Sequence, residues 1–244
     1  MSGRHEFAFY APEIVDLYKG HMPNEDLMCT GTPLVHRICQ VLRLQVGDSL
    51  ILFGSDSYIQ GIIKATARSS CCIEPRIIQS IVPLSPSLHL CIAVLERAAF
   101  ATAVEYATVL GVSAIYPVIT TKSKRKIIDT HEQDRLRRII IAAAEQSKQF
   151  SVPFLAPVMP IAQYRATGKL LVGDVTGTAL SVIVCSGTNK NTPLSLCIGP
   201  EGGLTERDFA DLQDEYETAL LASTTLRSEL AVAVGLGTIR GMLL

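Results

Sequence analysis

The chain has 244 residues, of which 48% are hydrophobic, enough for a packed core in one large domain or two modest ones. Its formal net charge of −1 excludes a protein that coats nucleic acid over its whole surface, because such domains are strongly basic. The seven cysteines are odd in number and include no Cys-x-x-Cys pair, so the sequence indicates neither a disulfide framework nor a metal site.

The N-terminus carries no apolar stretch flanked by Arg or Lys, and the longest apolar runs are too short or too broken to cross a bilayer. We therefore expect a cytoplasmic protein without a membrane partner. Cys91, Cys185 and Cys197 lie in apolar segments that look like strands. Free cysteines of this kind are expected to be small buried hydrophobic side chains.

Residues 6–79 alternate short apolar runs with Gly and Asp turn signals, as in Val41–Leu44, Ser49–Phe53 and Tyr58–Ile63. Many short strands separated by such turns predict a small antiparallel barrel. Pro83-Leu-Ser-Pro86 interrupts this pattern and is the expected linker. The predicted domains are therefore residues 1–82 and 83–244.

From Leu88 onwards the pattern becomes that of an α/β domain. Its expected helices are an apolar one over 98–110, an amphipathic one over 134–148 with apolar residues at i, i+3, i+4 and i+7, and a last one from Ser228. The expected strands are 89–95, 114–118, 170–173, 181–185, 194–198 and 218–222. This alternation predicts a mostly parallel sheet with helices on both faces.

A glycine-rich turn follows the buried strand Leu194–Ile198. Gly199, Gly202 and Gly203 leave the backbone uncovered and allow positive φ, and Thr205 with Asp208 three residues later forms the start of a helix. Such a strand-turn-helix junction can bind a small polar ligand through its backbone, and a tight structural turn is the alternative. The spacing matches neither a phosphate-binding P-loop nor a dinucleotide fingerprint.

This turn, Gly199-Pro-Glu-Gly-Gly203, resembles the signature of the 16S ribosomal RNA uridine-N3 methyltransferase family, in the SPOUT superfamily. Leu226-Arg-Ser-Glu-Leu-Ala231 is similar to the family's Leu-Arg-x-Glu-Thr-Ala and departs from it at Leu230. His36–Asp48, Leu110–Pro117 and Ala142–Ser147 resemble further family segments in the same order. The resemblance therefore extends over nearly the whole chain.

The resemblance implies a SPOUT-type α/β domain, with a trefoil knot that includes the glycine turn, preceded by a small PUA-like β-barrel that binds RNA. It implies transfer of the methyl group of S-adenosylmethionine to N3 of a uridine in 16S ribosomal RNA, free or in the small ribosomal subunit. It also implies a homodimer. The small residues of the last helix, such as Gly237 and Gly241, fit such an interface, and packing within one chain is the alternative.

The resemblance also implies a cofactor site. Its expected residues are Leu196, Ile198, Gly199, Pro200, Glu201, Gly202 and Gly203, with Leu221, Leu226 and Arg227 opposite. N3 of uracil reacts only after losing its proton, so a base or a cation that stabilises the uracil anion is required. Arg227 is the expected cation, with a structural salt bridge to Glu229 or Glu201 as the alternative. Glu229 is a possible base or orienting group, although a Glu in a first helical turn often only complements the helix dipole.

The expected RNA contacts are local clusters of cations. They are His36 and Arg43 in the barrel, and the loop residues Lys122, Lys124, Arg125 and Lys126, with Arg135, Arg137 and Arg138 shortly after. For the loop the alternative is a solvated surface segment, and we expect it to make no contact with the glycine turn. Leu95-Glu-Arg-Ala98 lacks a lysine usual in the family. Methylation of another RNA, or RNA binding without catalysis, therefore stay as alternative functions.

Overall fold

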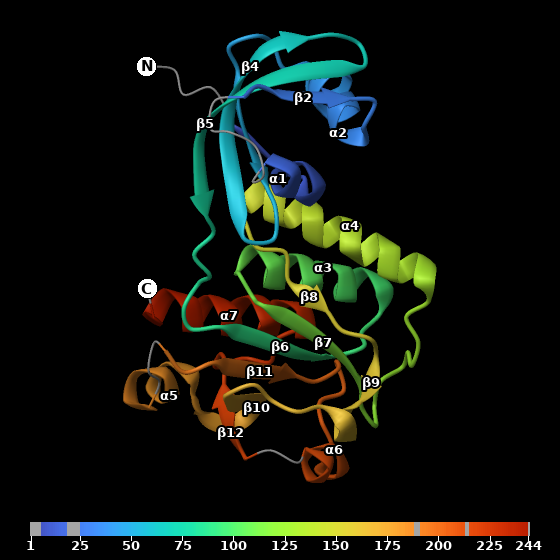
Figure 1. Ribbon diagram of the computed structural model, residues 1–244. Helices are drawn as coiled ribbons and strands as arrows, with labels where there is room; N and C mark the ends of the chain where they lie inside the picture. The colour runs from blue at the N-terminus through green and yellow to red at the C-terminus, as the bar shows by residue number, and fades with distance from the viewer. Residues whose placement is uncertain (1–5, 19–24, 188–190, 213–214, 244) are drawn as a thin grey trace. The chain divides into compact units, whose positions relative to one another are not determined.

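The computed structural model describes residues 6–18, 25–187, 191–212 and 215–243, and the chain divides into two compact units (Figure 1). The N-terminal unit comprises residues 1–82 and 144–151, and the C-terminal unit comprises 83–143 and 152–244. The outer ends of the two predicted domains, residues 1 and 244, lie outside the described residues. No helix within the described ranges is long and apolar enough to cross a lipid bilayer.

The N-terminal unit contains a five-stranded sheet in the order β1-β3-β4-β5-β2. Its strands pair antiparallel except for β1 and β3, which are parallel, and the arrangement is consistent with the small barrel that we expected. Phe9, Leu52, Ile59 and Ile73 are among the apolar side chains of its core. The elements are β1 (Phe7–Tyr10), α1 (Pro12–Tyr18), β2 (Leu27–Thr30), α2 (Pro33–His36), a π-helical turn η1 (Arg37–Val41), β3 (Ser49–Phe53), β4 (Ser57–Thr66) and β5 (Ser70–Ser80).

The strand expected at Val41–Leu44 is wrong, because the chain is helical up to Val41 and irregular after it. The helical run begins where the Thr32 side chain accepts a hydrogen bond from the Val35 backbone N–H, with Pro33 at the first helical position. Both residues favour a helix start. A short apolar run does not distinguish a strand from a helical turn, and the Thr-Pro pair upstream determines the outcome here.

The C-terminal unit contains a seven-stranded sheet in the order β12-β10-β11-β6-β7-β8, with β9 also paired to β7, and its pairings are parallel. The predicted parallel α/β domain is thereby confirmed. Its elements are β6 (Leu88–Ala93), α3 (Arg97–Val109), β7 (Ala114–Ile119), α4 (Thr130–Ser147), β8 (Phe154–Leu155), β9 (Met159–Pro160), η2 (Ile161–Gln163), β10 (Lys169–Ala179), α5 (Leu180–Gly187), β11 (Leu194–Ile198), α6 (Glu206–Asp211), β12 (Tyr216–Leu220) and α7 (Ser228–Leu243).

Side chains alternate between the two faces of this sheet, as the pleat requires. On β11, Leu196 and Ile198 belong to the core cluster that includes residues of α3, α4, α5 and α7. Cys197 belongs to the other cluster, with Tyr164 after η2 and Leu212 after α6. Helical segments therefore cover both faces, as predicted.

The strand predicted at 181–185 is also wrong, because these residues lie in the helix α5. A five-residue apolar run fits a buried strand or a helical turn equally well, and here the preceding strand β10 extends to Ala179. Cys185 is consequently exposed, whereas Cys91 and Cys197 are buried as expected. Helix α4 begins at Thr130 instead of 134, because the Asp129 carboxylate accepts a hydrogen bond from the Glu132 backbone N–H at 2.8 Å.

Candidate functional site

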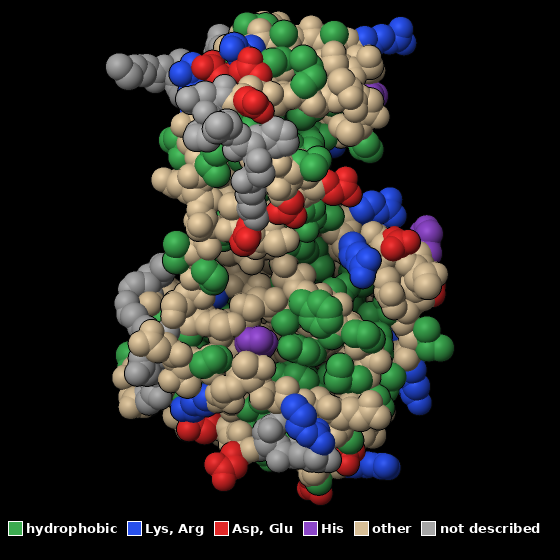
Figure 2. Space-filling view, viewed as in Figure 1, with side chains coloured by type: hydrophobic (Ala, Val, Ile, Leu, Met, Phe, Trp, Pro, Cys, Tyr) green, Lys and Arg blue, Asp and Glu red, His purple; other side chains and the backbone are tan. Residues whose placement is uncertain are grey.

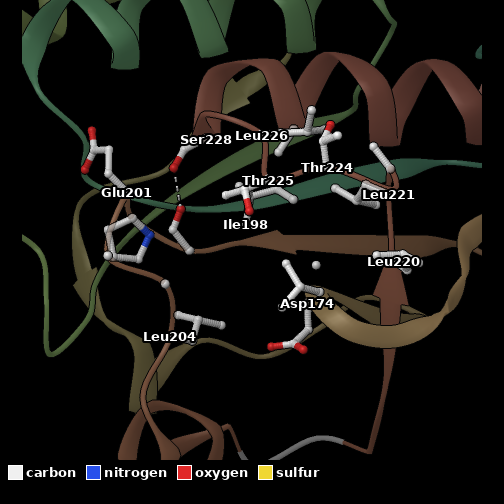
Figure 3. Close-up of a pocket in the computed structure, with 18 residues that line it drawn as sticks. Asp174, Ile198, Glu201, Leu204, Leu220, Leu221, Thr224, Thr225, Leu226 and Ser228 are labelled. Atoms are coloured by element: carbon white, nitrogen blue, oxygen red, sulfur yellow. Dashed lines mark hydrogen bonds between the residues drawn. The ribbon is translucent and has the colours of Figure 1, made fainter.

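A cavity of about 440 Å³ opens at the carboxyl end of β11 and β12, where the glycine turn meets the start of α7 (Figure 3). In open parallel sheets, ligands bind at this edge, and the volume is within the range of small-molecule sites. The residues that line the cavity are Gly173, Asp174, Val175, Ile198, Gly199, Pro200, Glu201, Gly202, Gly203, Leu204, Leu220, Leu221, Ala222, Thr224, Thr225, Leu226, Ser228 and Ala231.

The glycine turn has a defined backbone shape. The Gly203 N–H donates to Pro200 O at 2.8 Å, and the Ser228 hydroxyl donates to Gly199 O at 2.9 Å, the bond drawn in Figure 3. Among the three glycines of the turn, Gly203 alone has positive φ, at +71°. A Cβ on Gly203 would meet nothing within 4 Å, so the glycine is needed there for its conformation.

Gly202 contributes to the turn in a different way from the one the sequence indicated. Its φ is not in the left-handed region, and a Cβ built on it would lie 3.0 Å from Cδ of Lys122. The lysine stem therefore occupies the space beside this glycine.

The predicted start of α6 is confirmed. Thr205 is the N-cap residue, and it forms a capping box with Asp208. The buried Asp208 carboxylate accepts bonds at 2.8 Å from the Thr205 N–H and hydroxyl, and at 2.7 and 2.9 Å from the Thr121 N–H and hydroxyl. Burial alone would raise the pKa of Asp208, but these hydrogen bonds outweigh burial and lower that pKa below its ordinary value.

The loop after β7 touches the glycine turn, which corrects our expectation that it makes no such contact. The Lys122 ammonium donates to Gly202 O at 2.7 Å, next to the Thr121–Asp208 bonds. Neither contact was predictable from the sequence, because the partners are 80 and 87 residues apart.

Most of the predicted cofactor residues line the cavity. Those that do so are Ile198, Gly199, Pro200, Glu201, Gly202, Gly203, Leu221 and Leu226. Leu196 and Arg227 are not among the lining residues. Leu196 is 1% exposed and lies in the core, where its Cδ2 would be 2.7 Å from a Cβ on Gly235.

Arg227 precedes Ser228 at the start of α7 and is exposed, and Glu229 is half-buried. Within the ranges that the structure describes, no ion pair joins Arg227 to Glu201 or Glu229. The Arg227 carbonyl accepts the Ala231 N–H at 2.8 Å, which begins the helix. The guanidinium thus has no structural salt bridge with these two acids.

The side chains expected to contact RNA differ in whether they are exposed or already paired within the protein. His36, Arg43, Lys124 and Lys126 are exposed. Arg125 is directed inward, because its guanidinium donates to Leu95 O at 3.0 Å and pairs with the buried Glu132. We therefore leave Arg125 out of the proposed RNA surface. Arg97, 65% exposed, also reaches Glu132, with its Nε 3.4 Å from the carboxylate, and provides a cation near the position where the family lysine is missing.

Several residues that line the cavity were not predicted. Asp174 and Val175 come from an irregular stretch of β10, whose pairing with β12 shifts between Gly173 and Thr178. The Asp174 carboxylate accepts a bond from the Thr176 N–H at 2.7 Å. The sequence does contain a signal for these residues, the pair Gly173-Asp174 at the end of the predicted strand 170–173. The carboxyl ends of parallel strands share one edge of a sheet, so this pair could have been predicted to lie beside the glycine turn.

In the N-terminal unit, Arg37, which follows His36 in the chain, is paired with an acid. Its two Nη atoms donate to the Glu145 carboxylate at 2.9 and 2.6 Å, and the Tyr10 N–H donates to the same carboxylate at 2.9 Å. The hydrogen bond to Glu145 raises the pKa of Arg37. Glu145, in the segment Ala142–Ser147 that resembles the family, therefore holds β1 and η1 of the N-terminal unit, and Gln146 is exposed.

On the face that Figure 2 shows, Lys and Arg side chains are interspersed with Asp and Glu, which agrees with local and not general contact with nucleic acid. Within the described part of the chain, no group of three or more His, Cys, Asp or Glu side chains is placed to hold a metal ion.

Comparison with known proteins gives consistent matches. A protein of Rickettsia conorii called Ribosomal RNA small subunit methyltransferase E is 26% identical over 213 residues, which cover 84% of this chain and 86% of that protein. A Synechocystis protein of the same name is 26% identical, covering 87% of this chain and 72% of its own.

Among solved structures, a Ribosomal RNA small subunit methyltransferase E from Neisseria gonorrhoeae, bound to S-adenosylmethionine, superposes with a TM-score of 0.81. It is 20% identical and covers 97% of this chain and 98% of its own, so this likeness shows the fold. A putative methyltransferase of Legionella pneumophila with bound cofactor gives 0.77 at 20% identity, covering 98% of both chains. Residues 83–240 match the family described as RNA methyltransferase domain, and the chain belongs to that family.

Proposed function

We propose that this protein transfers the methyl group of S-adenosylmethionine to N3 of a uridine in 16S ribosomal RNA, in the cytoplasm and as a homodimer. The observation that carries the proposal is the cavity at the carboxyl edge of the sheet, lined by both sequence motifs of the resemblance. The relatives named as small-subunit ribosomal RNA methyltransferases support the substrate. The trefoil knot and the division into domains 1–82 and 83–244 belong to the same proposal.

The lining residues fit the cofactor. Figure 3 places Leu220 and Leu221 on one side of the cavity and Leu204 and Glu201 on the other, with Ile198 between them. The apolar side chains of Ile198, Leu204, Leu220 and Leu221 form a slot for an adenosyl group, and the backbone of Gly199–Gly203 supplies hydrogen-bonding groups. When bound, S-adenosylmethionine supplies a methyl group on a positively charged sulfur.

The reacting uracil needs help from side chains beside this slot. N3 must lose its proton as it attacks, and negative charge then spreads over the uracil ring. Arg227 is exposed between two residues that line the cavity, so its guanidinium is available to stabilise that charge. Glu229, on the first turn of α7, is the candidate for receiving the proton or orienting the base.

For RNA placement, the candidate cations of the C-terminal unit are the exposed Lys124 and Lys126 of the loop and Arg135, Arg137 and Arg138 of α4. Arg125 and Arg97, by contrast, are paired with acids. In the N-terminal unit, His36 and Arg43 are exposed and can contact RNA phosphates.

The central test is calorimetry with S-adenosylmethionine, followed by mass-spectrometric mapping of methylated nucleosides in ribosomal RNA from cells that lack the protein. We expect binding in the micromolar range and loss of one N3-methyluridine from 16S RNA. Loss of a mark from another RNA would support the alternative target. Absence of cofactor binding would favour RNA binding without catalysis.

The basic surface is tested by replacing Lys124 and Lys126 with Ala. The logarithmic salt dependence of RNA binding should become shallower by about 1.5, because about two fewer phosphates are neutralised. Lys169→Ala, which removes a lysine paired with Glu217, is the control and should keep the wild-type slope. A wild-type slope in the double variant would identify the loop as a solvated segment.

The dimer is tested on α7. A Cβ on Gly237 or Gly241 meets nothing within 4 Å in one chain, so this side of the helix has room for a second copy. Gly237→Leu should weaken the dimer by overpacking, as measured by sedimentation at micromolar concentration. A wild-type monomer under those conditions would contradict the proposal.

A further inference from the structure

Two consecutive residues after β7 hold the glycine turn from outside the cavity. Thr121 bonds to Asp208 on α6, and Lys122 bonds to the carbonyl of Gly202 in the turn. We call this pair the Thr121–Lys122 anchor. Neither residue lines the cavity, whereas Gly202 does.

Hydrogen bonds between the two residues that flank the anchor hold it in place. Thr120 and Ser123, which flank it, are buried, and the Ser123 N–H donates to Thr120 O at 3.1 Å. The Ser123 hydroxyl accepts the Thr120 N–H at 3.0 Å and lies 2.9 Å from the Thr120 hydroxyl. These bonds close a tight turn, so the directions of Thr121 and Lys122 are determined before any ligand binds.

Asp208 receives its hydrogen bonds from two segments. One carboxylate oxygen accepts both donors of Thr121, and the other accepts both donors of Thr205. A buried carboxylate with four donors has no free lone pair for proton transfer. Its role is to join the loop after β7 to Thr205, two residues after the glycine turn.

Lys122 completes the contact at the turn itself. Its stem covers Gly202, where a Cβ would be 3.0 Å from Lys122 Cδ, and its ammonium donates to Gly202 O at 2.7 Å. Both the stem and the ammonium of Lys122 therefore contact the glycine turn. Both Lys122 and Lys124, two residues on, are exposed, but Lys124 has no such bond among the described residues.

We infer that Thr121 and Lys122 are positioning residues for cofactor binding, and that Lys122 is not one of the RNA phosphate contacts. The anchor keeps the backbone of the glycine turn in its ligand-binding shape, so that the protein loses less conformational entropy when the ligand binds. This inference rests on the proposed function, because it takes the cavity as the S-adenosylmethionine site.

The test compares Lys122→Met with Lys124→Met, which remove the same charge from the same loop. Calorimetry should show S-adenosylmethionine binding about five- to tenfold weaker in Lys122→Met, the loss expected for one hydrogen bond of ordinary net strength at an exposed position. Lys124→Met should keep wild-type cofactor affinity. RNA binding should show the opposite pattern, with a shallower salt dependence in Lys124→Met only. Equal cofactor affinities in the two variants would overturn the inference.

A second measurement does not depend on the cofactor. Hydrogen exchange of peptides covering 199–208, without ligand, should be faster in Lys122→Met and in Thr121→Val than in Lys124→Met, because each loses a bond to the turn or to α6. Equal exchange in all three would also overturn the inference. If the wild-type protein does not bind S-adenosylmethionine at all, the proposed function fails, and the exchange experiment still decides whether the anchor holds the turn.

Discussion

The two walls of the cavity are built by different means. The wall formed by residues 199–204 is held by the bond from Lys122 to Gly202, and the start of α6 directly after it is held by the bond from Thr121 to Asp208. The wall formed by residues 220–226 consists mainly of apolar side chains and small threonines, and it leads directly into α7. The shape of the first wall therefore depends on individual hydrogen bonds, and the position of the second depends on how α7 is packed.

Helix α7 is fastened near its far end by a buried arginine. The Arg240 guanidinium donates to the carbonyls of Leu110 and Gly111, after α3, at 3.2 and 2.6 Å, and to that of Pro86 at 2.7 Å. Burial lowers the pKa of Arg240, but the value of an arginine is so high that the side chain stays charged. Both Asp208 and Arg240 are thus buried charges held by neutral donors or acceptors.

The largest effect is expected at the second wall. Arg227→Ala should lower single-turnover methyl transfer by about 100- to 1000-fold, because charge developing on uracil loses its cation. Cofactor affinity, measured by calorimetry, should change little, since Arg227 does not line the cavity. Methylation at the wild-type rate would remove the catalytic role of Arg227.

Loss of the arginine that fastens α7 should be the next largest effect. Arg240→Met should lower the free energy of unfolding by about 3 kcal/mol, because three buried carbonyls lose a charged donor. Urea unfolding measures this. Arg240→Lys keeps the charge but reaches fewer carbonyls, so an intermediate value is expected. An unchanged free energy of unfolding in both variants would show that these bonds make no net contribution to stability.

At the first wall, Asp208→Asn should lower the free energy of unfolding by about 2 kcal/mol at neutral pH. Because the folded pKa of Asp208 is depressed, the carboxylate stabilises the fold above its unfolded pKa of about 3.9, and this contribution is lost as pH falls through the folded value. The difference between wild type and variant should therefore shrink below about pH 4. Asp211→Asn, at a surface pair with Arg207, is the control and should change the free energy of unfolding little at neutral pH.

The smallest effect is expected from Gly203→Ala, which should cost about 1 kcal/mol because Ala is strained at a φ of +71°. Gly31→Ala is a matched control, since Gly31 also has positive φ, +64°, and open space around its Cα. Thermal unfolding should show similar losses in both variants. Only Gly203→Ala should weaken cofactor binding, and equal affinities would place the ligand away from the turn.

The sequence predicted the parts of the site that are local in the chain. Leu194–Ile198, the glycine turn and the Thr205–Asp208 capping box occupy one continuous stretch, so their pattern is readable from neighbouring residues. The parallel sheet was predictable for the same reason, because each strand and helix has its own periodicity.

The parts that were not predicted depend on contacts between segments far apart in the chain. The Lys122–Gly202 and Arg37–Glu145 bonds join residues 80 and 108 positions apart, and periodicity carries no information about such pairs. The same limit explains why Arg125 was expected at the RNA surface, since its partner Glu132 looks like any other helix-start acid. Short apolar runs such as 181–185 failed because they fit strand and helix alike.

The place of Glu145 in the chain has a consequence for synthesis. The N-terminal unit needs residues 144–151, and Arg37 has its carboxylate only after Glu145 has been made. A ribosome that has produced the five strands of the N-terminal sheet has therefore not yet produced the partner of Arg37 or of the Tyr10 N–H. The N-terminal unit is therefore completed only after residues 83–143 of the C-terminal unit have been made, so synthesis does not deliver the two units strictly one after the other.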